Sequence, residues 1–348
     1  MVAALRYAAS LPNGGDLTEL DQLKRRGFIT LLGSAAAWPL PARAQQQSAL
    51  PVIGFVSAGL PDAPLIAGFR KGLNEAGYAE SQNVTVEYHW LEGQFDRLPA
   101  LMADLARRRV AVIATPAGNL AAIAAKAATT TIPIVFSVGE DPVKLGLVDS
   151  LARPGGNATG FNIFNNEITA KRLGLLHDLV PKAIRVAVLV NPANTPTTEA
   201  TLRDIPDAAG ALGLQIQILN ASASREIEAA FATLVREQAD ALFVAADGFF
   251  NSRPGRLVTL AAHYRIPAAY SIREAVEAGG LMSYGTDRVD VSRQVGVYCA
   301  QILKGAKPAE LPVLQSTKFE FVINAQTARL LGVDVPNGLQ LLADEMIE

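Results

Sequence analysis

The chain has 348 residues, of which 50% are hydrophobic and 18% are charged, and its formal net charge is −2. A net charge so close to zero argues against nucleic acid as a partner, because proteins that bind nucleic acids carry basic surfaces. The single cysteine, Cys299, cannot form an internal disulfide. The histidines, His89, His177 and His263, lie far apart in the sequence. We therefore expect neither a metal site nor a cofactor.

Residues 1–44 have the pattern of an export signal. A Lys-Arg-Arg cluster at 24–26 precedes an apolar run at 30–40 and a small-x-small sequence, Ala-Arg-Ala, at 42–44. The adjacent arginines are similar to a twin-arginine signal. Because the apolar run is too short to span a bilayer, we expect cleavage after Ala44 and a periplasmic protein. A short buried helix is the alternative interpretation.

From residue 51 onward, strand-like and helix-like segments alternate, which is typical of a parallel sheet covered by helices. The first half predicts strands at 52–57, 84–90, 110–115, 132–138 and 159–164, and helices at 63–77, 98–108, 120–128 and 144–151. In the fourth strand an apolar run ends at Ser137, and Asp141 and Pro142 follow as the expected cap and first turn of a helix. Such a turn exposes N–H donors to a ligand, although an ordinary capped turn has the same residues.

The second half repeats the alternation. It predicts strands at 186–190, 214–219, 241–245, 267–270, 281–284 and 319–323, and helices at 170–180, up to 212, 226–238, 289–303 and 325–331, before a polar tail. We expect two doubly wound parallel-sheet lobes, in the α/β class, joined by hinge strands. Lobe 1 would comprise 51–163 and 285–312, and lobe 2 would comprise 164–284 and 313–348. A single large sheet is the alternative, but sheets of that width usually split.

Polar and aromatic residues at the strand ends are the candidate ligand-binding residues, because ligands bind beyond the carboxyl ends of strands in open α/β sheets. Hydroxyls and exposed N–H groups in lobe 1 would suit a carboxylate, whereas an acid in lobe 2 would suit an ammonium and its rings an apolar side chain. The candidates are Ser57, Thr115, Ser137 and Asp141 in lobe 1, and Asn191, Asp247, Tyr270, Glu274 and Tyr284 in lobe 2.

Each candidate also has a purely structural interpretation. Ser57 and Thr115 are able to cap the turns that follow them, and Asp247 precedes a glycine, as in many tight turns. Glu274 taken alone fits a solvated acid in the first turn of a helix. The candidates therefore gain weight only from occurring at matched positions in both halves.

Several motifs carry a resemblance to a known family. They are Val-Ile-Gly-Phe-Val from 52, Gly-Gln-Phe-Asp-Arg-Leu-Pro from 93, Asp-Pro-Val-Lys-Leu-Gly-Leu-Val from 141, Arg-Pro-Gly-Gly-Asn-Ala-Thr-Gly from 153, Val-Asn-Pro-Ala-Asn from 190 and Ala-Asp-Glu-Met-Ile-Glu from 343. In combination they resemble ABC transporter substrate-binding proteins that include tryptophan- and tyrosine-binding members. The resemblance implies a type I periplasmic-binding-protein clamshell, a small-molecule ligand, and delivery to the permease of an ABC importer.

Two other function classes remain open at this point. An exported α/β enzyme is disfavoured because the sequence has no G-x-S-x-G elbow, dinucleotide loop or P-loop. A ligand-sensing domain for a membrane receptor differs from a transport protein only in its partner. We expect a monomeric binding protein for an amino acid or a similar small zwitterion or carboxylate.

Overall fold

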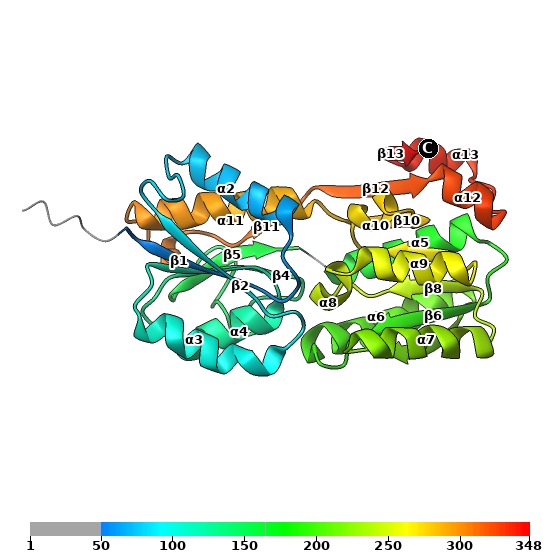
Figure 1. Cartoon of the computed structure of the whole chain (residues 1–348), viewed down its shortest axis with the longest axis horizontal. Helices are drawn as coiled ribbons and strands as arrows, with labels where there is room; N and C mark the ends of the chain where they lie inside the picture. The colour runs from blue at the N-terminus through cyan, green and yellow to red at the C-terminus, as the bar shows by residue number, and fades with distance from the viewer. Residues whose placement is uncertain (1–49, 164) are drawn as a thin grey trace, which may run out of the picture. The chain divides into compact units, whose positions relative to one another are not determined.

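The computed structural model describes residues 50–163 and 165–348, so the expected export signal lies outside the described residues. Two sheets organise this part of the chain, with helices on their faces (Figure 1). The expected α/β class is confirmed, and two separate sheets are present in place of a single large one. None of the helices in the described ranges is long and apolar enough to cross a membrane.

The first lobe contains a six-stranded parallel sheet in the order β11-β5-β4-β3-β1-β2. Its strands are β1 (Val52–Ser57), β2 (Thr85–Trp90), β3 (Val112–Ala117), β4 (Ile134–Val138), β5 (Ala158–Asn162) and β11 (Leu314–Gln315). Its helices are α2 (Ala63–Glu75), η1 (Phe95–Arg97), α3 (Leu98–Arg107), α4 (Asn119–Ala128), α11 (Arg288–Leu303) and η2 (Pro308–Glu310).

The second lobe contains a seven-stranded sheet in the order β13-β12-β10-β9-β8-β6-β7. Its strands are β6 (Arg185–Val190), β7 (Gln215–Asn220), β8 (Ala241–Val244), β9 (Ala268–Tyr270), β10 (Met282–Thr286), β12 (Phe319–Asn324) and β13 (Glu345–Ile347). Its helices are α5 (Asn165–Leu179), α6 (Thr195–Leu212), α7 (Ser224–Arg236), α8 (Gly248–Asn251), α9 (Pro254–His263), α10 (Arg273–Glu277), α12 (Ala325–Leu331) and α13 (Asn337–Leu342). Only the pairing of β12 with β10 is antiparallel among the described strand pairs.

The chain passes between the sheets three times. It leaves the first sheet after β5, returns after β10 through α11, and enters the second sheet again at β12 (Figure 1). Because β11 pairs with β5 through Leu314 and Gln315, the last passage follows Gln315 and lies a few residues beyond the expected boundary at 312.

Helix α11 is anchored in the first lobe by close backbone contact with α2. A Cβ added at Gly72 would lie 1.8 Å from the carbonyl oxygen of Arg293, and one at Gly296 would lie 2.2 Å from that of Phe69. The glycines therefore let the two helix backbones touch. This contact fixes the start of α11, which carries Arg288, beside the first lobe.

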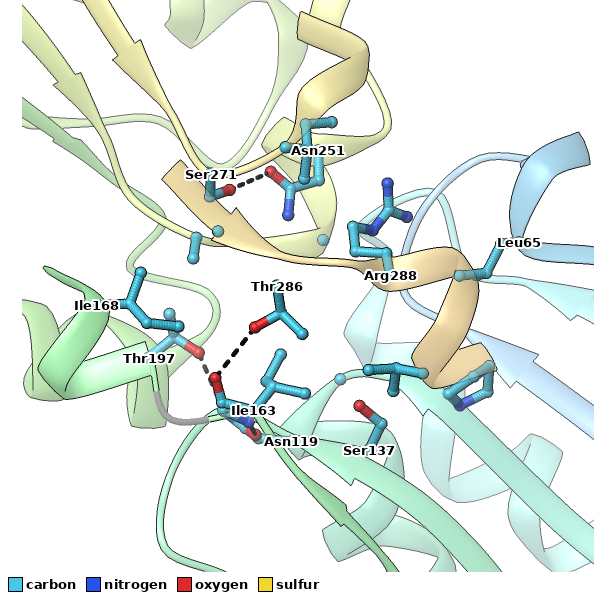
Figure 2. Close-up of a pocket in the computed structure, with 18 of the residues that line it drawn as sticks. Leu65, Asn119, Ser137, Ile163, Ile168, Thr197, Asn251, Ser271, Thr286 and Arg288 are labelled. Atoms are coloured by element: carbon cyan, nitrogen blue, oxygen red, sulfur yellow. Dashed lines mark hydrogen bonds between the residues drawn. The ribbon is translucent and has the colours of Figure 1, made fainter. Parts of the chain in front are cut away.

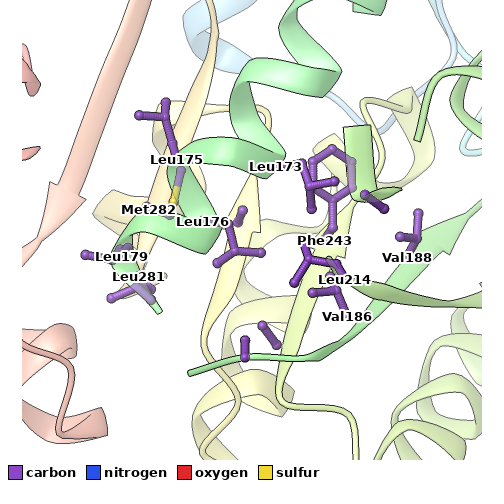
Figure 3. Close-up of a cluster of buried hydrophobic side chains, with 14 of the residues drawn as sticks. Leu173, Leu175, Leu176, Leu179, Val186, Val188, Leu214, Phe243, Leu281 and Met282 are labelled. Atoms are coloured by element: carbon purple, nitrogen blue, oxygen red, sulfur yellow. The ribbon is translucent and has the colours of Figure 1, made fainter. Parts of the chain in front are cut away.

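Among the described residues the second lobe has an apolar core on each face of its sheet: one lies between α5 and the sheet (Figure 3), and the other, which includes Phe231 of α7, lies on the opposite face. Leu173 and Leu176 on one face of α5 pack with Val188 of β6 and Phe243 of β8, and all four side chains are fully or almost fully buried. Burial of a large apolar side chain contributes roughly 1.5–3 kcal/mol. This packing holds α5 rigidly against the carboxyl ends of β8 and β10.

Two expected features differ in the structure. The helix predicted at 144–151 is a series of turns, in which the Asp141 side chain accepts from the Val143 amide at 2.9 Å and Gly146 adopts a left-handed φ of 70°. Gly146 ends the helical conformation after one turn. The predicted polar tail instead forms α13 and the edge strand β13, which pairs with β12.

Candidate ligand-binding site

A cavity of about 90 Å³, measured for the centre of a water-sized sphere, lies where the strand ends of both lobes meet. One water needs roughly 10–15 Å³ on this scale, so the cavity has room for a small organic molecule. The first lobe contributes Asn119 and Ser137, and the second contributes Arg172, Thr197, Asn251 and Ser271. Apolar wall comes from Leu65, Ile163, Ile168, Ile272 and Val291 (Figure 2).

Asn119 is one of the polar residues that join the two lobes. It is the first residue of α4, and its Nδ2 donates to Thr197 Oγ1, at the start of α6, over 3.0 Å. The same Nδ2 also donates to Glu140 Oε2, and Oδ1 accepts from the Gly139 amide at 3.1 Å. This network fixes the loop after β4, and with it Ser137, at the edge of the cavity.

Glu140 is buried behind this network, with 8% of its surface exposed. Its Oε1 has no hydrogen-bond partner among the described residues. Desolvation is the main reason that the pKa of Glu140 rises to about 7, against a smaller lowering by Thr197. The sequence interpretation included the neighbouring Asp141, an expected helix cap, among the ligand-binding candidates and missed Glu140.

Asp247 does not line the cavity. Its Oδ1 accepts from Asn191 Nδ2 at 3.0 Å and from the Phe249 amide at 2.9 Å, and its Oδ2 accepts from Asn194 Nδ2 at 2.6 Å. Burial raises the pKa of Asp247, and the hydrogen bonds from Asn194 and Asn191 oppose that rise. Asp247 and Asn191 thus tie the loop after β6 to the start of α8, which supports the wall of the cavity from behind.

The remaining candidates divide into buried and peripheral residues. Ser57, Thr115 and Tyr270 are buried, and neither Thr115 Oγ1 nor the Tyr270 hydroxyl has a partner among the described residues. Asp141 caps its own turn, and Tyr284 is partly buried in the second lobe. Of the nine candidates, the structure brings only Ser137 to the cavity wall.

Glu274 belongs to an ion-pair network at the side of the cavity. Arg288, at the start of α11, donates to Asp62 Oδ2 at 2.8 Å and to Glu274 Oε1 at 3.3 Å. Asp62 caps α2 in the first lobe, whereas Glu274 lies on α10 in the second. The carboxylate of Glu274 is therefore engaged with Arg288, which links the lobes at this side.

Arg172 of α5 is the other arginine in the wall, and sequence reasoning missed it. Only 1% of its surface is exposed, and its guanidinium lies 4.4 Å from the centre of the Phe243 ring. Desolvation lowers the pKa of Arg172 to about 9, so the side chain stays protonated at neutral pH. A sequence signal exists, because Arg172 stands four residues from both Ile168 and Leu176 and so shares the apolar face of the helix.

Comparisons with known proteins agree with this arrangement. Residues 52–347 match the family described as ABC transporter substrate binding protein. A tyrosine-binding protein of Clostridioides difficile is 27% identical over 267 residues, which are 76% of this chain and 75% of that protein.

Comparison with solved structures confirms the expected two-lobed, type I periplasmic-binding fold. An ABC domain from Streptococcus pneumoniae in complex with L-Trp is 26% identical, with a TM-score of 0.75, and covers 86% of this chain and 100% of its own. A conserved domain protein from Vibrio cholerae is 25% identical, with a TM-score of 0.76, and covers 85% of this chain and 99% of its own. With its two lobes, the cavity between their strand ends and the family match over nearly all the described residues, the chain belongs to the ABC transporter substrate-binding proteins.

Proposed function

We propose that this protein captures a small ligand, an amino acid or a similar small zwitterion or carboxylate, between its two lobes and delivers it to an ABC importer. The observation that carries the proposal is the cavity itself, which combines polar side chains from both lobes with an apolar wall. Ligand sites of proteins typically have this composition. The tyrosine-binding relative and the L-Trp complex support an amino-acid-like ligand.

The contacts around the cavity support capture by closure. Asn119 bonds to Thr197 across the lobes, and Arg253 of the second lobe donates to the carbonyl of Glu92 in the first at 3.2 Å. Such contacts between lobes are available only when the strand ends meet. A ligand that touches both lobes would stabilise this closed arrangement over an open one.

Export and the partner complete the proposal. We infer that residues 1–44 direct the protein to the periplasm, with cleavage after Ala44, and that a monomer presents its ligand to the membrane permease. Substrate binding rather than catalysis is the activity of the family. Localisation of a fusion to the first 44 residues, with the two arginines at 25 and 26 replaced by lysine as the control, tests the export step.

A thermal-shift screen of the purified protein tests the binding function. The panel consists of the common amino acids, their des-amino acids and a set of sugars. We expect a rise in Tm with at least one compound that carries a carboxylate, because only the folded state binds it. The absence of any shift across the panel would contradict the proposal, as would turnover of the bound compound instead of its intact recovery.

A further inference from the structure

We infer that Arg172 binds the carboxylate of the ligand and that the ligand is a compact apolar carboxylate whose amino group, if present, is not required. This inference rests on the proposed function and deepens it, because it names the recognised group and the residue that recognises it. It replaces the sequence expectation in which neutral hydroxyls hold the carboxylate and an acid holds an ammonium.

The Arg172 guanidinium is only weakly satisfied by the protein. Its two terminal nitrogens donate to the carbonyls of Tyr284 and Val244, both at 3.4 Å, which is long for a hydrogen bond. Its Nε has no partner, and none of its contacts among the described residues is a carboxylate. A buried charge without a counter-ion is costly, and a ligand that supplies the negative charge would remove that cost.

The guanidinium of Arg172 lies in the wall of the cavity and is held in place there. Arg172 lines the cavity, and the two carbonyls that hold it belong to Val244, the last residue of β8, and to Tyr284, in the middle of β10. The stem is fixed by the α5 core, and the ring of Phe243 lies under the guanidinium. The side chain is therefore held in one place before any ligand arrives, which lowers the entropic cost of binding. A guanidinium also offers a carboxylate two parallel N–H donors.

The described wall of the cavity carries positive charge. Its charged members among the described residues are Arg172 and Arg288, and Arg288 is already paired with Asp62 and Glu274. No described carboxylate lines the cavity. The N-terminus of α4, which faces the cavity from the other lobe, begins at Gly118 without a side-chain cap and adds positive potential. The described wall thus favours an anion and offers no carboxylate to pair with an ammonium.

The apolar part of the cavity wall indicates what the rest of the ligand is. Leu65, Ile163 and Ile168 supply branched aliphatic wall on both sides of the cavity, together with Ile272 and Val291. Apolar surface of this kind selects an apolar body by removing it from water. Neutral polar groups such as Asn251 and Ser271, which bond to each other at 2.8 Å, need no charged ligand group.

The test compares matched ligands on the purified protein. A thermal-shift screen first covers all the common amino acids, together with the des-amino acids and amides of the apolar ones. Calorimetry then titrates three compounds for phenylalanine and three for leucine: the amino acid, its des-amino acid (phenylpropionate or isocaproate) and its amide. We expect the amino acid and the des-amino acid with a given side chain to bind. The amide should bind at least about 30-fold more weakly, because it lacks the negative charge that would pair with a buried guanidinium.

Variants then assign the effect to one residue. Arg172→Met should weaken carboxylate binding by at least about 30-fold while leaving the Tm of the ligand-free protein unchanged or higher, because an uncompensated buried charge is removed. Arg172→Lys, which keeps the charge but loses the fork, should weaken binding at least about tenfold and serves if the methionine variant does not fold. Arg236→Met, at an exposed position on α7, is the matched control and should bind as the wild type does.

The outcomes separate the two proposals. If the amides bind as tightly as the acids, or if both Arg172 variants bind carboxylates with wild-type affinity, the assignment of Arg172 is overturned and the binding function stands. If an amino acid binds but its des-amino acid does not, the claim about the amino group is overturned. If no member of the screened panel binds, the proposed function fails and this inference fails with it.

Discussion

Replacement of Glu140 by glutamine should change how the stability of the protein depends on pH. The Glu140 carboxyl is buried behind Asn119 with one oxygen unpartnered, and its pKa is about 7 instead of the ordinary 4.5. A carboxyl with a raised pKa in the folded state binds its proton more tightly there than in the unfolded chain. The folded state therefore gains stability as pH falls from above 7 toward 4.5 and loses it as pH rises through 7.

The size of the effect follows from the two pKa values. Linkage gives a cost of roughly 3 kcal/mol for an ionised Glu140 at about pH 8.5, and under roughly 1 kcal/mol at about pH 5. Glutamine keeps an oxygen for the Asn119 amide and carries no charge. The free energy of unfolding of Glu140→Gln minus that of the wild type should therefore rise by roughly 2.5 kcal/mol when the pH is raised from about 5 to about 8.5.

Urea unfolding at both pH values measures this difference, with the slope m checked for constancy. Glu228→Gln is the matched control, because that carboxylate is exposed on α7 and paired with Arg256 at the surface. Its difference from the wild type should change little with pH. A Glu140→Gln difference that stays the same at both pH values would refute the argument that burial holds the proton on this side chain.

Three further substitutions, one of them with a matched control, test the packing and the lobe contact. Gly72→Ala should destabilise the protein by several kcal/mol in urea unfolding, because its Cβ would meet the Arg293 carbonyl. Gly210→Ala, with open space around it, is the control and should be neutral or stabilising by up to about 1 kcal/mol. Similar effects at both sites would contradict the close approach of α2 and α11. Phe231→Ala, at a side chain 1% exposed in the core on the α7 side of the second sheet, should cost about 3–5 kcal/mol by the same assay, and a loss below about 1 kcal/mol would show that this core is wrongly assigned. Asn119→Ala should weaken ligand binding in calorimetry about tenfold through loss of the Thr197 contact across the lobes, and unchanged affinity would remove that bond from the closed state.

Most strands of both lobes were predictable because they are short runs of branched and aromatic apolar residues. Ile134–Val138 and Arg185–Val190 lie within one or two residues of the expected ranges. The helix expected at 144–151 was wrong because a plausible cap and first-turn proline do not ensure a helix when Gly146 takes a left-handed conformation. The edge strand β13 was missed because only its pairing with β12 makes Glu345–Ile347 a strand.

The candidate site was less predictable than the fold. Strand ends are visible in the sequence, but alternate residues of a strand point to opposite faces, so Ser57 and Thr115 are buried away from the cavity wall while Ser137 reaches it. Asp247 was chosen for its charge, yet Asn191 and Asn194, separated from it by more than fifty residues, satisfy both oxygens. Arg172 lies on a helix, and only the packing of α5 on the sheet brings it to the cavity.

Native mass spectrometry of the protein purified from its own host tests the central claim most directly. If the two lobes enclose one metabolite, the folded protein should carry the added mass of a single small molecule, and denaturation should release that molecule intact, with a free carboxylate. A bare protein mass that persists after incubation with the full panel of amino acids and des-amino acids, or a released compound that has been chemically altered, would contradict the account.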